Sequence, residues 1–217
     1  MKKPIIVPAI LAKDADDFTS KLDCITPYFK RAQIDIMDGT LVPNTSFHDV
    51  KKIKTIKTTL DYELHLMVND PRRYIRAWGG YPRCKLVIFH IEATKSERDI
   101  YGIIRMANQR GMRAGIALNP DTSLERIHRF VPHLNAVLLM GVTPGKSGQR
   151  FIKNVHSKII KARQLYPSLD IEVDGGVNEK NAPRIVKEGA NILASASMVF
   201  SSTNIPLLKK RVGHAKT

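Results

Sequence analysis

The 217-residue chain has two cysteines, few aromatic residues and no long apolar run, and each shortage excludes a class of protein. Cys24 and Cys84 cannot form a disulfide framework and stand in no Cys-x-x-Cys pair, so we expect reduced thiols and a cytoplasmic protein. No segment approaches the length of a membrane span, and the first residues lack the apolar core of a secretion signal. We therefore expect no membrane partner.

Acidic residues are scarce beside basic ones: 20 Asp and Glu stand against 35 Lys and Arg, which gives a formal net charge of +15. Such an excess is compatible with nucleic-acid binding, an anionic substrate or a basic surface. The basic residues are scattered, and with only 6% aromatic residues no stacking platform for single strands is evident. We interpret the charge as a solvated surface that assists capture of an anionic substrate, and we do not expect a nucleic-acid partner.

The chain does contain a regular succession of short apolar, β-branched runs. Strands are expected over residues 5–11, 32–37, 61–67, 85–90, 113–118, 136–142, 170–173 and 191–195. Helices are expected over residues 14–25, 71–78, 97–110, 123–130, 152–165 and 179–188. The expected helix N-caps are Asp14, Ser96, Ser123 and Asn178.

Eight strand–helix units without a long linker predict an α/β fold, with one (β/α)8 barrel domain over residues 1–217. A doubly wound open sheet is the main alternative, but the glycine-rich dinucleotide fingerprint is missing after the first strand. Because barrel enzymes carry their active sites at the carboxyl ends of the strands, the residues at those ends are the candidates for function.

Two of the expected strands end in aspartate next to glycine, one in the run from Gln33 to Gly39 and the other at Asp174. Alternation along the first of these strands places Gln33, Asp35 and Met37 on one face. A carboxylate on the inner side of a strand has to be paired, metal-bound or catalytic, because burying it alone costs too much free energy.

A third strand end carries His65. Asp35, His65 and Asp174 form a suitable ligand set for Zn²⁺, Mn²⁺ or Fe²⁺, and Gln33 points the same way with a carbonyl oxygen that is only a weak ligand. The alternative is a hydrogen-bonded polar cluster that closes the mouth of the barrel. His90 and Glu92 are more easily interpreted as partners of such ligands than as ligands.

Glycine-containing loops follow the sixth and seventh strands, and the run Ala194–Ser197 follows the eighth. Their backbone N–H groups, with the start of a following helix, are suited to bind a phosphate group, although glycines also close tight turns. Methionines lie at the ends of the second, third and sixth strands, where they fill the core or face a ligand. The candidate substrate-binding residues are Ala9, Met37, Met67, Met140, Gly145, Gly148, Gln149, Gly175, Gly176, Ala196 and Ser197.

Taken in order, these motifs resemble the ribulose-phosphate 3-epimerase family along essentially the whole chain. The matching strings are Val7–Leu11, Ile34–Gly39, Val42–Asn44, His65–Val68, Phe89–Ala93, Leu118–Pro120, Leu138–Met140, Pro144–Gly145, Gly148–Gln149 and Glu172–Gly176.

The resemblance implies a TIM barrel of the ribulose-phosphate-binding type and a step of pentose phosphate metabolism. D-ribulose 5-phosphate and D-xylulose 5-phosphate would be interconverted by metal-assisted proton transfer at C3, with Asp35 and Asp174 alternating as acid and base on opposite faces of an enediolate. Met37, Met67 and Met140 would cap the intermediate. A phosphorylated ketose substrate, a divalent metal and a homo-oligomer are further expectations.

Three departures from the family pattern stand out. Gln33 replaces the first histidine of the usual metal set, and a neutral amide binds zinc more weakly than imidazole does. Ala9 replaces a serine of the first strand. In the phosphate loops, Lys146-Ser147 replace Phe-Gly, and Ala196 replaces a glycine before the last serine. These departures keep one alternative open, a non-catalytic sugar-phosphate-binding homologue that has lost metal. A second alternative, a 3-epimerase of a hexulose 6-phosphate, stays open because one more hydroxymethylene group changes only the distance from the metal to the phosphate site.

Overall fold

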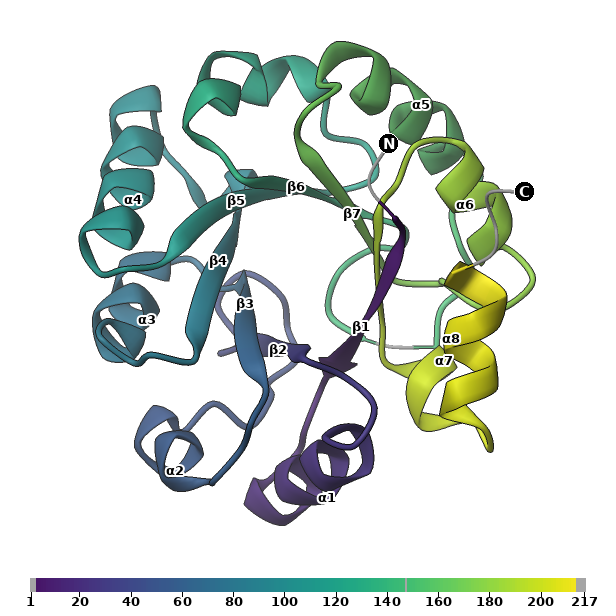
Figure 1. Cartoon of the computed structure of the whole chain (residues 1–217). Helices are drawn as coiled ribbons and strands as arrows, with labels where there is room; N and C mark the ends of the chain where they lie inside the picture. The colour runs from purple at the N-terminus through teal and green to yellow at the C-terminus, as the bar shows by residue number, and fades with distance from the viewer. Residues whose placement is uncertain (1–2, 147, 214–217) are drawn as a thin grey trace.

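Eight parallel strands close into a barrel in the computed structural model, which describes residues 3–146 and 148–213 (Figure 1). Each strand pairs with the next along the chain, and the last pairs with the first. The strands are β1 (Ile5–Ile10), β2 (Arg31–Met37), β3 (Asp61–Met67), β4 (Cys84–His90), β5 (Arg113–Leu118), β6 (Ala136–Met140), β7 (Asp170–Asp174) and β8 (Ile192–Ser195). The predicted (β/α)8 barrel is confirmed.

The helices lie outside the ring of strands (Figure 1). They are α1 (Ala15–Ile25), α2 (Val50–Thr55), α3 (Pro71–Trp78), α4 (Glu97–Gln109), α5 (Val155–Leu165), α6 (Ala182–Lys187), α7 (Ser197–Phe200) and α8 (Ile205–Gly213), with 3₁₀ segments η1 (Ile91–Ala93) and η2 (Leu124–His133). Asp14 and Ser96 cap α1 and α4 as predicted, because their side chains accept hydrogen bonds from the N–H groups of Asp17 and Asp99.

Local chemistry explains where the predicted elements differ from the observed ones. The helix expected over residues 123–130 is the 3₁₀ segment η2, which contains Pro132 and so lacks one backbone donor. Helix α6 begins at Ala182 instead of residue 179, because Asn178 Oδ1 accepts from the N–H groups of Lys180 and Asn181 and forms a turn there. The short helices α2, α7 and α8 were not predicted.

Alternation along β2 separates two environments. Ile34 and Ile36 belong to the apolar layer between the strands and the helices, whereas Gln33 and Asp35 point into the barrel with less than a tenth of their surface exposed. The other side of the barrel interior is apolar and is filled by Leu86, Ile88, Ala117, Ala136, Leu138, Met140 and Val142. The polar interior of β2, β3 and β7 therefore lies against an apolar wall from β4, β5 and β6.

Among the residues that the structure describes, no helix has the length and apolar character needed to cross a membrane.

Candidate active site

A cavity opens at the carboxyl ends of the strands, where barrel enzymes place their chemistry. Its lining includes these predicted residues: Ala9, Asp35, Met37, His65, Met67, Met140, Gly145, Gly148, Asp174, Gly175, Gly176, Ala196 and Ser197. It also includes five residues outside the predicted set: Leu11, Val142, Pro144, Lys146 and Ser195. Two predicted residues, Gln33 and Gln149, are not part of this lining.

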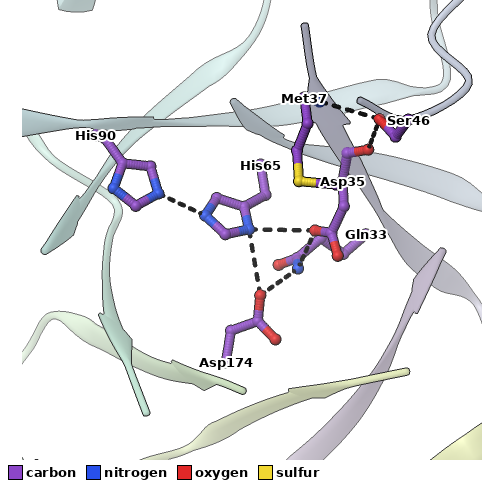
Figure 2. A network of polar contacts seen from close by, with 7 residues as sticks. All are labelled: Gln33, Asp35, Met37, Ser46, His65, His90 and Asp174. Atoms are coloured by element: carbon purple, nitrogen blue, oxygen red, sulfur yellow. Dashed lines mark hydrogen bonds and ion pairs between the residues drawn. The ribbon is translucent and has the colours of Figure 1, made fainter. Parts of the chain in front are cut away.

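The centre of the cavity is a buried group of two carboxylates and one imidazole from three strands. His65 Nδ1 on β3 lies 3.1 Å from Asp35 Oδ1 on β2 and 3.2 Å from Asp174 Oδ2 on β7 (Figure 2). Parallel register places Asp35 directly beside His65, while Asp174 reaches them from the far side of β1 and β8. Residues more than a hundred positions apart thus converge on one nitrogen atom.

Gln33 lies fully buried between the same two carboxylates. Its amide nitrogen Nε2 donates to Asp35 Oδ1 at 2.8 Å and to Asp174 Oδ2 at 2.9 Å (Figure 2). Its carbonyl oxygen Oε1 is buried and has no hydrogen-bond partner in the described part of the chain. The amide therefore holds the two carboxylates together as a neutral donor.

Proton affinities in the centre follow from burial and from this crowding of charge. Burial, and then the charge of Asp174, raises the pKa of Asp35, while hydrogen bonds from His65 and Gln33 oppose the increase. Burial by itself lowers the pKa of His65, but the contacts with Asp174 and Asp35 outweigh burial and raise that pKa to about 9. At neutral pH the imidazole is therefore protonated and partly balances the two carboxylates.

A chain of hydrogen bonds behind His65 fixes which of its nitrogens faces the carboxylates. His65 Nε2 lies 2.9 Å from His90 Nε2, and His90 Nδ1 lies 3.2 Å from Glu92 Oε2. Glu92 is ionised because hydrogen bonds from His90, Thr122 and Asn119 outweigh its burial and lower its pKa to about 2. Burial lowers the pKa of His90, so the neutral ring gives its Nδ1 hydrogen to Glu92 and accepts from His65 Nε2.

One positioning residue was missed by the sequence analysis. Ser46 is buried in the loop after β2, where its hydroxyl donates to Asp35 O at 2.7 Å and accepts from Met37 N at 3.0 Å. These bonds fix the end of β2, on which Asp35 and Met37 stand (Figure 2). No local motif marks a serine nine residues after the strand end, so only the folded loop reveals it.

The other part of the cavity lining comes from loops. Gly145, Gly148, Gly175 and Gly176 all have positive φ, and a Cβ on Gly176 would lie 2.7 Å from the backbone nitrogen of Phe151. These glycines are therefore required by the backbone itself. Ser147, which belongs to the predicted phosphate loop, lies outside the described residues.

Gln149 has a different position from the one predicted. Its amide nitrogen donates to Thr143 O at 2.8 Å and to Lys146 O at 2.9 Å, so its side chain closes the loop and does not line the cavity. Lys146 lines the cavity at this end. At the neighbouring loop, Ser195 Oγ accepts from Met198 N at the start of α7, next to Ala196 and Ser197.

The donor set of the centre is compatible with a divalent metal ion. One ligand atom each from Asp35, His65 and Asp174 lies within 4.8 Å of the others, and all three residues are buried. Two carboxylate oxygens and an imidazole nitrogen are ligands that Zn²⁺, Mn²⁺ and Fe²⁺ accept. In the orientation observed, Gln33 presents its amide nitrogen to the two carboxylates and so adds no ligand atom to this set.

Fold and site together define a class: a parallel (β/α)8 barrel enzyme with a two-carboxylate, one-imidazole centre capable of holding a metal. The family model described as the ribulose-phosphate 3 epimerase family matches residues 5–200. This chain belongs to that family.

Curated relatives span nearly the whole chain. A ribulose-phosphate 3-epimerase of Bacillus subtilis is 33% identical over 92% of this chain and 93% of the relative. One from Schizosaccharomyces pombe is 35% identical over 90% of this chain and 86% of the relative. One from Mycobacterium bovis is 30% identical over 98% of this chain and 94% of the relative.

Solved structures of more distant proteins share the fold. The 3-hexulose-6-phosphate synthase from Salmonella typhimurium superposes with a TM-score of 0.71 at 13% identity, covering 97% of each chain. A tryptophan synthase alpha-subunit from Pyrococcus furiosus gives a TM-score of 0.67 at 13% identity, covering 98% of this chain and 97% of the other. At such low identity these similarities support the barrel architecture alone.

Proposed function

We propose that this chain is a ribulose-phosphate 3-epimerase, which interconverts D-ribulose 5-phosphate and D-xylulose 5-phosphate. The observation that carries the proposal is the convergence of Asp35 and Asp174, from β2 and β7, on His65 in a cavity at the strand ends. Family membership and the names of the relatives support the same conclusion.

The reaction inverts one carbon centre, and this requires two proton-transfer groups. The proton on C3 is α to a ketone, so its removal gives a planar enediolate, and the new proton has to arrive on the other face. Asp35 on β2 and Asp174 on β7 are two carboxylates from separate strands, and in this proposal each serves one face. In the metal-free centre, burial and the charge of Asp174 raise the pKa of Asp35, which favours proton uptake by this carboxylate.

Other side chains of the centre prepare these carboxylates. In the metal-free centre, protonated His65 and the Gln33 amide donate to both of them, which keeps two negative groups close together in a buried place. His65 has to release its Nδ1 proton before that nitrogen can bind a metal ion. A divalent ion held by Asp35, His65 and Asp174 would supply Lewis-acid stabilisation of the negative charge that develops on the substrate oxygens. We propose that this ion is Zn²⁺, Mn²⁺ or Fe²⁺.

The remaining lining suits the two ends of a ketose phosphate. Met37, Met67 and Met140 give the cavity an apolar side that excludes water from the enediolate. The glycine loops and Lys146 line the other end, where backbone N–H groups and a positive charge attract a phosphate group. Ala9 and Ala196 also line the cavity and provide only methyl groups.

The test is an epimerase assay on protein purified without chelators and then supplied with Zn²⁺, Mn²⁺ or Fe²⁺ in turn. We expect interconversion of the two pentulose phosphates with at least one of these ions. If none supports turnover while the protein still binds the sugar phosphate, the alternative of a non-catalytic binding protein is correct. That alternative is favoured by one observation, the Gln33 amide bonded to both carboxylates.

Two further parts of the proposal concern the whole molecule. We propose that residues 1–217 act as one barrel domain and that copies of the chain associate into a homo-oligomer. Light scattering coupled to size exclusion tests the second point, with a mass above that of the 24.4 kDa chain as the expected result.

A further inference from the structure

Gln33 occupies its buried position in only one of two possible orientations. Both hydrogens of its amide nitrogen are used by the carboxylates of Asp35 and Asp174, at 2.8 and 2.9 Å. An amide nitrogen that donates in this way has no lone pair for a metal ion. In the orientation observed, Gln33 therefore binds its neighbours but cannot act as a ligand.

Charge explains this orientation. Rotating the carboxamide by half a turn would put Oε1 against two anionic oxygens, and in a buried place this repulsion is strong. The observed orientation has its own cost, because Oε1 is left buried without a hydrogen-bond partner among the described residues. Leaving a buried acceptor unpaired costs the free energy of its lost hydration. A divalent cation bound to both carboxylates would reverse this preference, because it takes up their lone pairs and attracts Oε1 in place of the amide hydrogens.

The spacing of the polar atoms is that of neighbouring ligands around one ion. Gln33 Nε2 lies 2.8 Å from Asp35 Oδ1 and 2.9 Å from Asp174 Oδ2, and His65 Nδ1 lies 3.1 and 3.2 Å from the same oxygens. Two ligands at right angles around an ion, each bonded at about 2.1 Å, are roughly 3 Å apart. A half turn about the Cγ–Cδ bond exchanges the amide oxygen and nitrogen without moving the rest of the side chain.

We propose that the Gln33 carboxamide is a two-position switch: it donates to Asp35 and Asp174 in the metal-free protein, and it turns its Oε1 to a divalent cation when one binds between them. The resulting donor set has three oxygens and one nitrogen, which favours the oxygen-preferring Mn²⁺ relative to Zn²⁺ more than a second imidazole would. This inference rests on the proposed function for the place of the ion, but binding measurements test it without turnover.

The direct test follows the side-chain amide of Gln33 by ¹⁵N–¹H NMR, assigned by its loss in Gln33→Met. In the metal-free protein we expect two hydrogen-bonded protons that exchange slowly. Addition of Zn²⁺, with the ¹⁵N shift of His65 Nδ1 as evidence that the ion is in the centre, should move both protons upfield. Gln149 is the internal control, because its amide also makes two hydrogen bonds but to loop carbonyls.

A second measurement compares cation affinities by chelator competition in the wild type and in Gln33→His. We expect the substitution to raise Zn²⁺ affinity by about tenfold or more and Mn²⁺ affinity by less than about threefold. The proposal is overturned if Zn²⁺ shifts His65 but leaves the Gln33 amide protons in place, if no cation binds, or if both affinities rise equally. An inactive protein that shows the amide rotation would refute the proposed function and leave this inference intact.

Discussion

The two ends of the active-site cavity are built in different ways. At the acid–base end, Asp35, His65 and Asp174 stand on strands and are held by other buried side chains. At the other end, the lining comes from loops whose glycines have positive φ, together with Lys146. The first end depends on charge and donor pattern, so a substitution such as Gln33 is accommodated only by a new hydrogen-bond arrangement. The second offers backbone groups, and its conformation depends on glycines that a side chain would strain.

The largest difference between the two ends should appear when the carboxylates are neutralised. Asp35→Asn and Asp174→Asn keep the shape of each side chain but remove the base, so we expect each to lower kcat by about 10³-fold or more. Steady-state kinetics with both pentulose phosphates measures this. Asp38→Asn is the matched control, because that carboxylate bonds to Thr40 and Tyr74 outside the centre and its loss should leave kcat within about threefold. If Asp35→Asn or Asp174→Asn retains a tenth of the wild-type kcat, the proposed difference between the two ends of the cavity is contradicted.

Glu92→Gln tests whether the acid–base end depends on its supporting hydrogen bonds. The pKa of Glu92 is lowered to about 2 from 4.5, so its ionised form stabilises the fold above pH 4.5, and this contribution is lost as the pH falls through about 2. We expect the variant to lose roughly 2 kcal/mol of unfolding free energy at pH 7. Urea denaturation at a series of pH values should show the two proteins converging in acid. If the difference in unfolding free energy between the two proteins stays constant with pH, the charge of Glu92 contributes nothing to stability.

Lys146→Ala tests the loop end, where we expect an effect on binding alone. Removing one positive charge near the phosphate should raise KM by about tenfold and change kcat by less than about twofold. Lys51→Ala, on the exposed face of α2, controls for the general loss of positive charge. If Lys146→Ala lowers kcat as strongly as the aspartate variants do, the two ends are not functionally separate.

The smallest effect is expected at Ala196, whose methyl group lines the cavity between Ser195 and Ser197. Ala196→Gly removes this methyl group and should lower KM by about threefold with kcat unchanged. An inhibition series with inorganic phosphate offers an independent measurement, because its inhibition constant should fall in parallel. A rise in KM would show that the methyl group packs against the ligand usefully.

The sequence was sufficient to predict much of the acid–base end. Asp35, His65 and Asp174 follow short apolar runs, and the barrel rule places such strand ends at one mouth. The period of two also separated Gln33 and Asp35 from Ile34 and Ile36 correctly. Successive side chains of a strand point to opposite faces, so the position of a residue along the strand determines which face its side chain occupies.

What the sequence did not predict depends on loops and on three-dimensional hydrogen bonding. Ser46 comes from a loop, and Gln149 turns to its own loop carbonyls. The amide of Gln33 was expected to offer a carbonyl oxygen, whereas it presents its nitrogen to the carboxylates. That orientation is set by the charges around it, which become known only when residues from β2, β3 and β7 have been brought together.

The central claim is that Asp35 and Asp174 serve opposite faces of one planar intermediate, and hydrogen exchange at C3 in D₂O tests it most directly. In Asp35→Asn and Asp174→Asn the remaining carboxylate still faces one epimer. The account predicts that one variant exchanges the C3 hydrogen of D-ribulose 5-phosphate alone and the other that of D-xylulose 5-phosphate alone, without interconversion. Exchange of the same epimer by both variants, or epimerisation by either at the wild-type rate, would contradict it.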